Sequence, residues 1–272
     1  MNSAMKGAGG PRANDSAAIG STTDVAIDFQ NVVKRFGSRT VLRGINLEVR
    51  RGEIVFILGT SGTGKSVLLK TLVGLLRADE GKILIEGQDV AQLSEADYLP
   101  IRRHCGMVFQ HPALFDSMTV GENVAFGLMK HERKTYEQAL PRVRECMEQV
   151  GLSGVEDRMV NEISYGMQKR VSLARTLAVG PRILLFDEPT TGLDPITTRQ
   201  INNLIRDLSH RLQTTALVVS HDMECALTIA DRIIVLSEGQ IVEQGTVEQI
   251  LRSKVPLVVD FLAEANASRG ES

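Results

Sequence analysis

The sequence contains no tryptophan and only three cysteines among its 272 residues. Cys105, Cys146 and Cys225 lie far apart, and their spacing matches no arrangement of metal ligands. An odd and sparse set of thiols suits a reducing compartment, where each cysteine serves as a small apolar side chain. The cysteines therefore argue against a cysteine-ligated metal protein, and we expect a cytoplasmic protein.

Long apolar runs and an excess of one charge are also missing. The longest runs, such as Ile54–Leu58 and Ile183–Phe186, are far shorter than the roughly 20 residues that cross a bilayer. Any role at a membrane would therefore need another chain to supply the membrane part. The formal net charge is −2, so we expect no nucleic-acid partner. Residues 1–24 are rich in Ala, Gly and Ser and lack the apolar core of a signal peptide, which predicts a disordered tail.

The sequence does contain a phosphate-binding loop, because residues 59–66 read Gly-Thr-Ser-Gly-Thr-Gly-Lys-Ser. The apolar residues before it predict a buried strand, and those after it predict a helix. Backbone N–H groups and the helix dipole would hold phosphate oxygens, Lys65 would reach the β- and γ-phosphates, and the Ser66 hydroxyl would ligate Mg²⁺. The predicted binding residues are Gly59, Thr60, Ser61, Gly62, Thr63, Gly64, Lys65 and Ser66.

Two later segments end in residues suited to triphosphate chemistry. The apolar stretch Ile183–Phe186 is followed by Asp187 and Glu188, and Leu217–Ser220 is followed by His221. Ligands of open α/β sheets bind at the carboxyl ends of the strands. Asp187 is suited to hold Mg²⁺, Glu188 to orient or deprotonate water, and His221 to contact a γ-phosphate. A carboxylate pair or a histidine alone is commonly a surface feature, and the phosphate-binding loop is what favours a site.

The remaining pattern predicts an α/β fold in which a mixed core sheet carries an antiparallel β layer and an inserted helical subdomain. The predicted strands outside the site are Val25–Val32, Val41–Val49, Lys82–Gly87, Gly106–Phe109, Arg232–Leu236 and Gln240–Glu243. The predicted helices start at Ser94, span 120–129, 136–150 and 167–179, and begin again at Val247 and Leu257. We assign residues 25–252 to one folded α/β domain, about 98–179 to its helical subdomain, and 253–272 to a C-terminal tail.

Taken in order, these motifs resemble the ATP-binding subunit of an ABC transporter over about residues 25–252. Gly59–Ser66 resembles the Walker A loop, and Ile183–Glu188 resembles the Walker B strand with its catalytic glutamate. Gly192–Asp194 resembles the D-loop, so Asp194 is included among the nucleotide-site residues. Gln110 resembles the Q-loop glutamine, which in the family senses the metal and the transmembrane partner. His221 resembles the switch histidine. The resemblance implies ATP and Mg²⁺ as cofactors.

Two further parts of the resemblance concern recognition of the nucleotide. Phe36 matches the position that stacks on adenine, although packing in a hairpin has equal weight from the residues alone. Residues 163–167 read Ile-Ser-Tyr-Gly-Met where the family signature is Leu-Ser-Gly-Gly-Gln. Ser164 and Gly166 remain, and the resemblance implies that they contact the γ-phosphate of a second copy in a homodimer. Tyr165 disfavours a positive φ, so either the backbone there is ordinary or the geometry of the signature is altered.

The kind of transporter is a narrower question. Residues 106–126, Met167 and the segment Asp194–Thr197 resemble those of Mla-type ATPases, which serve phospholipid trafficking with MCE-domain partners in Gram-negative envelopes. This implies a homodimer at the cytoplasmic face of the inner membrane, bound to a permease and an MCE-domain substrate-binding protein. The alternative is the ATPase of an amino-acid or other small-solute importer, whose helical subdomain carries similar Phe-Gln and Thr-Val-x-Glu-Asn-Val sequences.

Other classes of function fit the sequence less well. DNA-repair members of the family insert a long coiled coil between the two Walker motifs, and no sustained heptads stand between Lys65 and Asp187. Translation-type members usually carry two cassettes in one chain. A small-molecule kinase would leave Ser164–Arg170 and His221 unexplained. Leu114, Phe115 and Met118 follow Gln110 closely, and they either receive a helix of the membrane subunit or pack the helical subdomain.

Overall fold

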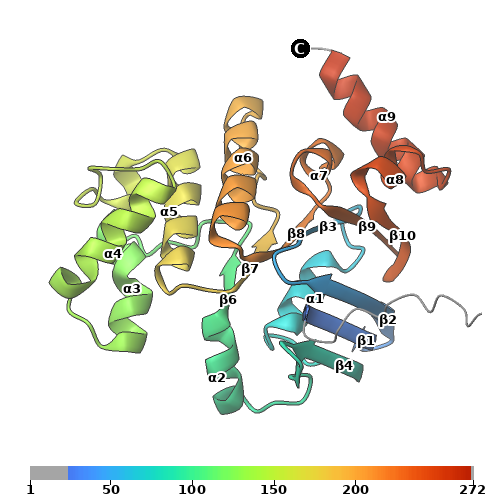
Figure 1. Cartoon of the computed structure of the whole chain (residues 1–272), viewed down its shortest axis with the longest axis horizontal. Coiled ribbons are helices and arrows are strands. Elements are labelled where there is room, and N and C mark those ends of the chain that lie inside the picture. The colour runs from blue at the N-terminus through green and yellow to red at the C-terminus, as the bar shows by residue number, and fades with distance from the viewer. Residues whose placement is uncertain (1–23, 271–272) are drawn as a thin grey trace, which may run out of the picture.

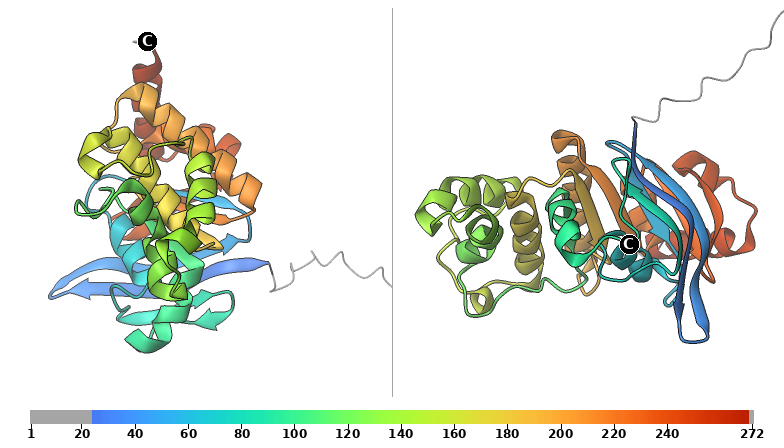
Figure 2. Two further views of the ribbon diagram at one scale, coloured as in Figure 1. Left: turned by 90° about the vertical axis from the view of Figure 1, so that its left-hand side faces the viewer. Right: turned by 90° about the horizontal axis from the view of Figure 1, so that it is seen from below.

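The computed structural model describes residues 24–270, so the tail that we expect over residues 1–24 falls outside the described residues except for Asp24. Figure 1 shows an antiparallel β layer beside the core sheet at one end of the molecule and a group of helices at the other. The views in Figure 2 agree, with the long β1–β2 hairpin at the end away from those helices.

The β layer has the strand order β2-β1-β4-β5. Strand β1 (Val25–Phe36) pairs antiparallel with β2 (Arg39–Arg50), as the sequence predicts, and also with β4 (Glu80–Ile85). The sequence pattern does not predict the short strand β5 (Gln88–Asp89). Buried residues of these strands, such as Ile27, Phe29 and Leu47, pack against helix α1 (Lys65–Leu72) and one face of the core sheet.

The core sheet has the strand order β10-β9-β3-β8-β7-β6 and is mixed, as predicted. Its strands are β3 (Ile54–Leu58), β6 (Cys105–Val108), β7 (Ile183–Asp187), β8 (Thr215–Ser220), β9 (Arg232–Ser237) and β10 (Gln240–Thr246). All pairings are parallel except that of β9 with β10. Every residue of β3, β7 and β8 is buried, which explains their apolar runs Ile54–Leu58, Ile183–Phe186 and Ala216–Val219.

Alternate residues of each core strand face opposite layers. Val55 and Ile57 join the cluster formed with α1 and the β layer, whereas Ile54, Phe56 and Leu58 join a second cluster on the other face. Helices α6 (Pro195–Leu212) and α7 (Met223–Ile229) cover that second face, and the sequence pattern predicts neither. The sequence signal for α6 is its start, where Asp194 accepts hydrogen bonds from Ile196 and Thr197 N–H groups ahead of a first-turn proline.

The helical subdomain contains α3 (Val120–Glu132), α4 (Tyr136–Gln149) and α5 (Tyr165–Ala178), close to their predicted ranges. Helix α2 (Glu95–His104) starts after Ser94, whose side chain caps it as predicted. The range 98–179 also takes in β6 and most of α2, which belong to the other part of the molecule. Tyr98 of α2, for example, is buried against α1 and donates a hydrogen bond to the Leu72 carbonyl at 3.2 Å.

The chain continues past β10 into α8 (Val247–Leu251) and α9 (Pro256–Gly270), where the sequence predicts helical segments. Within the segment that we assign to a C-terminal tail, Val258, Phe261 and Ala265 are buried in the second core cluster. Helix α9 contacts α7, the helix that follows His221. In Figure 1 α8 and α9 lie at the far side of the core sheet from the helical subdomain.

Candidate functional site

The phosphate-binding loop joins the end of β3 to the start of α1, as predicted. Gly59 passes so close to β9 that a Cβ there would lie 2.5 Å from the Leu236 carbonyl oxygen, which leaves room for no side chain. Gly64 has a φ of 108° and turns the chain into the helix. The loop is therefore shaped by its glycines, and backbone N–H groups at the N-terminus of α1 are available for an anion.

Lys65 is the charged group at the centre of this loop. Its ammonium donates hydrogen bonds to the carbonyl oxygens of Gly59 at 2.6 Å and Thr60 at 3.1 Å, and it lies 3.7 Å from Oε1 of Glu188. The side chain is 6% exposed. Burial lowers the pKa of Lys65, and the nearby carboxylates of Glu188 and Asp187 oppose that shift. Lys65 is thus placed to deliver positive charge at the mouth of the loop.

Ser66 and Asp187 are in contact although they lie 121 positions apart in the sequence. The Ser66 hydroxyl donates a hydrogen bond to Oδ1 of Asp187 at 2.7 Å. Oxygen donors of this kind are the ligands that Mg²⁺ prefers, so the pair fits the predicted metal site. Among residues 24–270 no group of three or more His, Cys, Asp and Glu side chains is placed to hold a metal ion.

Glu188 follows Asp187 and collects several polar contacts at the same edge of the sheet. Its Oε2 accepts a hydrogen bond from the Ser220 hydroxyl at 2.9 Å and lies 3.0 Å from Nδ1 of His221. A longer contact of 3.4 Å comes from the Thr191 hydroxyl. The backbone of Glu188 has a φ of 48°, a strained value for a residue with a side chain, and such strain is commonly found at functional positions. Glu188 and His221 therefore meet at this edge of the sheet.

The convergence follows from strand order. Strands β3, β8 and β7 are neighbours and run parallel, with Leu58 paired to Ser220 and Asp187 paired to Val219. Residues that come after these strands must therefore emerge at one edge of the sheet.

Phe36 lies beside the loop, at the end of β1. Its side chain is 46% exposed, and the Lys34 ammonium is 5.3 Å from its ring centroid. Together with Arg39 and Val41 it lines a pocket whose other wall is made by loop and helix residues, namely Gly62, Gly64, Lys65, Ser66 and Val67. An exposed aromatic ring at that place is suited to stack on a flat base.

Gln110 comes two residues after the end of β6, in an exposed loop. Its carbonyl accepts a hydrogen bond from Nζ of Lys169, a buried residue of α5. Burial lowers the pKa of Lys169 to about 8, and the charge of Glu188 opposes that shift. Gln110 thus follows β6, the strand beside β7, and its main chain is hydrogen-bonded to α5.

Ser164, Gly166 and Asp194 lie together in a pocket to which the phosphate-binding loop contributes no residue. They line a pocket with Tyr165 and Gly192, and in the part of the chain that the structure describes this pocket shares no residue with the one beside Phe36. The Ser164 hydroxyl caps α5 by accepting from the Met167 N–H at 3.3 Å. Tyr165 begins α5 with a helical backbone, which confirms that no positive φ is needed there.

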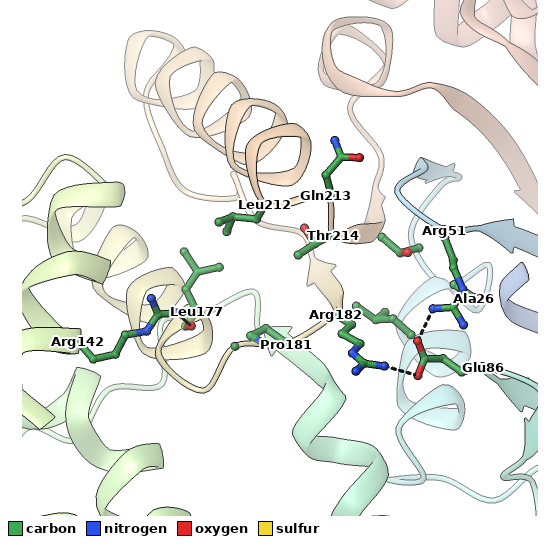
Figure 3. A pocket seen from close by; sticks show the side chains of 13 residues that line it. Ala26, Arg51, Glu86, Arg142, Leu177, Pro181, Arg182, Leu212, Gln213 and Thr214 are labelled. Carbon is green, nitrogen blue, oxygen red and sulfur yellow. Dashed lines mark hydrogen bonds and ion pairs between the residues drawn. The ribbon is translucent and has the colours of Figure 1, made fainter. Parts of the chain in front are cut away.

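Another pocket opens at the opposite edge of the core sheet, at the starts of β7 and β8 (Figure 3). Arg51 and Arg182 reach Glu86 from two sides, at 2.5 and 3.2 Å. Across the pocket Arg142 donates to the carbonyl oxygens of Leu177 and Ala178 at the end of α5. These arginines compensate a carboxylate and a helix C-terminus, so the pocket has a structural explanation.

Sequence reasoning misses the groups that support the site. Its pattern places Ser220 at the end of a strand, and the contact of Ser220 with Glu188 depends on the strand order β8-β7, which no local pattern reveals. Lys169 stands out in the sequence only as part of the signature segment, and its bond to Gln110 joins residues 59 positions apart.

No helix within residues 24–270 has the length and apolar character needed to cross a membrane.

Known proteins resemble this chain over the region that contains these motifs. Residues 42–191 match the family described as ABC transporter. The methionine import ATP-binding protein MetN of Rhizobium johnstonii is 45% identical over 227 residues, covering 84% of this chain and 62% of that protein. The intermembrane phospholipid transport system ATP-binding protein MlaF of Haemophilus influenzae is 39% identical over 236 residues, covering 87% of this chain and 89% of that protein. The chain therefore spans less than two thirds of the MetN relative.

A solved structure agrees in fold. The dimeric ATP-binding cassette MJ0796, in a post-hydrolysis state bound to ADP and Pi, superposes with a TM-score of 0.74 at 33% identity. The match covers 81% of this chain and 98% of that one. This similarity confirms the predicted α/β cassette with its antiparallel layer and mixed sheet.

Proposed function

The chain belongs to the ABC transporter family, as an ATP-hydrolysing ATP-binding domain, and from this premise we propose that it drives phospholipid transport across a Gram-negative cell envelope. ATP hydrolysis is supported by one observation. Five side chains meet at one edge of the core sheet, namely Lys65, Ser66, Asp187, Glu188 and His221. The phospholipid part is supported by the similarity to MlaF and by residues 106–126.

In this proposal ATP lies with its phosphates in the loop Gly59–Ser66 and its adenine against Phe36. Lys65 supplies positive charge to the β- and γ-phosphates, and the N-terminus of α1 supplies N–H donors. Ser66 and Asp187 would hold Mg²⁺, and Gln110 would be a further ligand from its loop. When bound, Mg²⁺ neutralises charge that develops on the phosphate oxygens.

Glu188 orients the attacking water and accepts its proton, because its carboxylate is held at the edge where the strands end. Ser220 and His221 fix the carboxylate through Oε2, which leaves Oε1 toward Lys65. His221 is 60% exposed, so its ring is free to contact the γ-phosphate as well.

We propose that Ser164, Gly166 and Asp194 serve the site of a second copy, so that two ATP molecules lie between two subunits. Their pocket shares no described residue with the one beside Phe36 and the phosphate-binding loop, which supports this arrangement. MJ0796 was solved as a dimer. Closing and opening of the homodimer would then move the membrane partner.

The partner in this proposal is a permease that binds beside the loop after Gln110, at the cytoplasmic face of the inner membrane, together with an MCE-domain substrate-binding protein. Phe115 is 41% exposed, with its ring centroid 4.7 Å from that of Phe126. Leu114 packs partly against the second core cluster, and Met118 is half-buried. Phe115 is therefore the apolar side chain of the three that is most available to a partner helix.

The second candidate is an importer ATPase for an amino acid, because MetN is 45% identical to this chain. Purification of the tagged protein from detergent-solubilised native membranes tests the two candidates. A polytopic permease with an MCE-domain protein supports phospholipid transport, whereas a permease with a periplasmic solute-binding protein supports the importer.

A Phe115→Glu variant should lose the permease and keep nucleotide binding. If wild-type protein captures no membrane chain, the transport proposal is wrong.

A further inference from the structure

Helix α5 binds the loop that follows β6 through the main chain of that loop. Nζ of Lys169 donates a hydrogen bond to the carbonyl oxygen of Gln110. Arg175 donates to the carbonyl oxygens of Ala113 at 2.8 Å and Pro112 at 3.2 Å. We call residues 110–113 the glutamine loop, and its backbone is thus attached to the helical subdomain at both ends.

Tyr165 adds a contact from the first turn of the same helix. Its hydroxyl lies 3.4 Å from Nδ1 of His111, and its ring centroid is 5.5 Å from Nζ of Lys169. Residues 165 and 169 are one helical turn apart, so their side chains share one side of α5. The aromatic ring that stands where the family signature has glycine therefore joins the same set of contacts.

Lys169 is the buried charged side chain of this set, at 3% exposure. A buried ammonium is tolerated only where it finds hydrogen-bond acceptors or opposite charge. The acceptor is the Gln110 carbonyl, and the carboxylate of Glu188 is close enough to act on the ammonium electrostatically. Moving Gln110 away would leave the buried ammonium without its hydrogen-bond acceptor. The positions of the lysine and the loop are therefore strongly coupled.

Gln110 is tied to the core sheet from the other direction. Val108, the last residue of β6, pairs with Phe186, which precedes Asp187. The glutamine loop therefore bridges the strand beside the metal-binding carboxylate and the helix that starts at Ser164. Its position is set jointly by β6 and by the side chains of α5.

We propose that Lys169 is a positioning residue for ATP hydrolysis, which holds Gln110 by its main-chain carbonyl and so sets the reach of the Gln110 side chain toward Ser66 and Asp187. The Tyr165 hydroxyl contacts the neighbouring His111. The glutamine loop and helix α5 then move as one unit. This inference rests on the proposed ATPase function and adds to it a specific link between two motifs.

The test compares Lys169→Met, which removes the ammonium but keeps an unbranched apolar stem, with Lys169→Arg, which keeps the cation. Lys130→Met, at an exposed position of α3, is the matched control. Hydrogen exchange of backbone amides is measured on the full chain without nucleotide or metal. We expect exchange over residues 109–118 to rise by about tenfold in Lys169→Met and to stay near wild type in the arginine and control variants.

Kinetics provide the second readout. We expect kcat to fall by about tenfold in Lys169→Met while the Kd for ATP, measured with EDTA present, stays within about twofold of wild type. Unchanged exchange over residues 109–118 would overturn the proposal, as would a Kd that rises in step with the loss of kcat. If wild-type protein hydrolyses no ATP, the proposed function fails, and the exchange data alone then decide whether Lys169 anchors the loop.

Tyr165→Phe separates the two contacts, because it keeps the ring and removes the hydroxyl that faces His111. A smaller rise in exchange than in Lys169→Met, confined to the same residues, supports Lys169 as the stronger anchor of the loop. A rise spread over the whole helical subdomain in either variant would indicate general loosening and would overturn the assignment.

Discussion

Glu188 is the residue on which the polar contacts of the site converge. It lies between Lys65 on one side and Ser220 with His221 on the other. Its backbone conformation is strained, and the surrounding contacts compensate for that strain. The positions of Asp187, Glu188 and His221 could be predicted from sequence because each lies at the carboxyl end of an apolar strand. The contact of Ser220 with Glu188 could not, because it forms only when β8 lies beside β7.

Removal of the Ser220 hydroxyl tests this support. Ser220→Ala takes one hydrogen bond from a carboxylate, an interaction of about 1.5 kcal/mol, so kcat should fall by about tenfold with the Kd for ATP unchanged. Ser209→Ala is the matched control, because the Ser209 hydroxyl on α6 is buried and has no hydrogen-bond partner in the structure. Steady-state ATPase assays and nucleotide titrations measure both effects. Equal rates for Ser220→Ala and the control would contradict the support role.

The cysteines give a second prediction for individual residues. All three are buried, and burial raises the pKa of Cys105 to about 12 and of Cys146 to about 11, and raises that of Cys225 as well. A raised pKa keeps the thiol protonated, so raising the pH from about 7 to about 9 should not speed alkylation of the folded protein, as it would for an exposed thiol. Mass spectrometry after iodoacetamide treatment should show no adduct until urea is added. Rapid labelling of any cysteine in the native protein would show that its burial is wrong.

Among the helices and strands, the core strands and the helices of the helical subdomain follow their sequence patterns closely, whereas the 18-residue helix α6 is not predicted. The predicted ranges for α3, α4 and α5 and for the core strands hold, because uninterrupted apolar runs and capping residues mark them. The short elements β5 and α7 carry too few residues for a periodic pattern. The range 98–179 combines α2 and β6 with the helical subdomain because local sequence does not reveal which layer an element packs against.

Helix α9 gives a prediction for a whole element. Phe261 is 6% exposed within the second core cluster, and α9 packs on α7 beside the site. Phe261→Ala should lower the free energy of unfolding by about 3 kcal/mol, because it removes a buried ring and leaves a cavity. Val259→Ala on the exposed side of α9, where the side chain is 45% exposed, should cost about 0.5 kcal/mol. Urea unfolding distinguishes the two, and similar costs would mean that α9 does not contribute to the core.

In the molecule as a whole, the pocket beside Phe36 and the pocket beside Ser164 share no residue in the part of the chain that the structure describes. In the proposed homodimer, each nucleotide site combines the Phe36 pocket of one copy with the Ser164 pocket of the other. The pairing of copies is inferred from resemblance, since no residue pattern within one chain specifies its partner.

The expected outcome is an ATP-dependent dimer. Glu188→Gln protein, which should bind ATP without hydrolysing it, should double in mass by light scattering when ATP and Mg²⁺ are added. Adding Ser164→Arg to that variant should keep it monomeric, because a bulky cation would then occupy the shared surface. A protein that stays monomeric with ATP, or a Ser164→Arg protein that dimerises as well, would contradict the composite site.

The catalytic role of Glu188 is tested by the rate of ATP hydrolysis of the protein purified with its co-purifying chains, compared between wild type and Glu188→Gln. We expect the substitution to lower kcat by about a hundredfold while ATP binding is kept, because the group that accepts the proton of water is lost. Hydrolysis at the wild-type rate in Glu188→Gln would contradict the assignment of this edge of the sheet as the catalytic site.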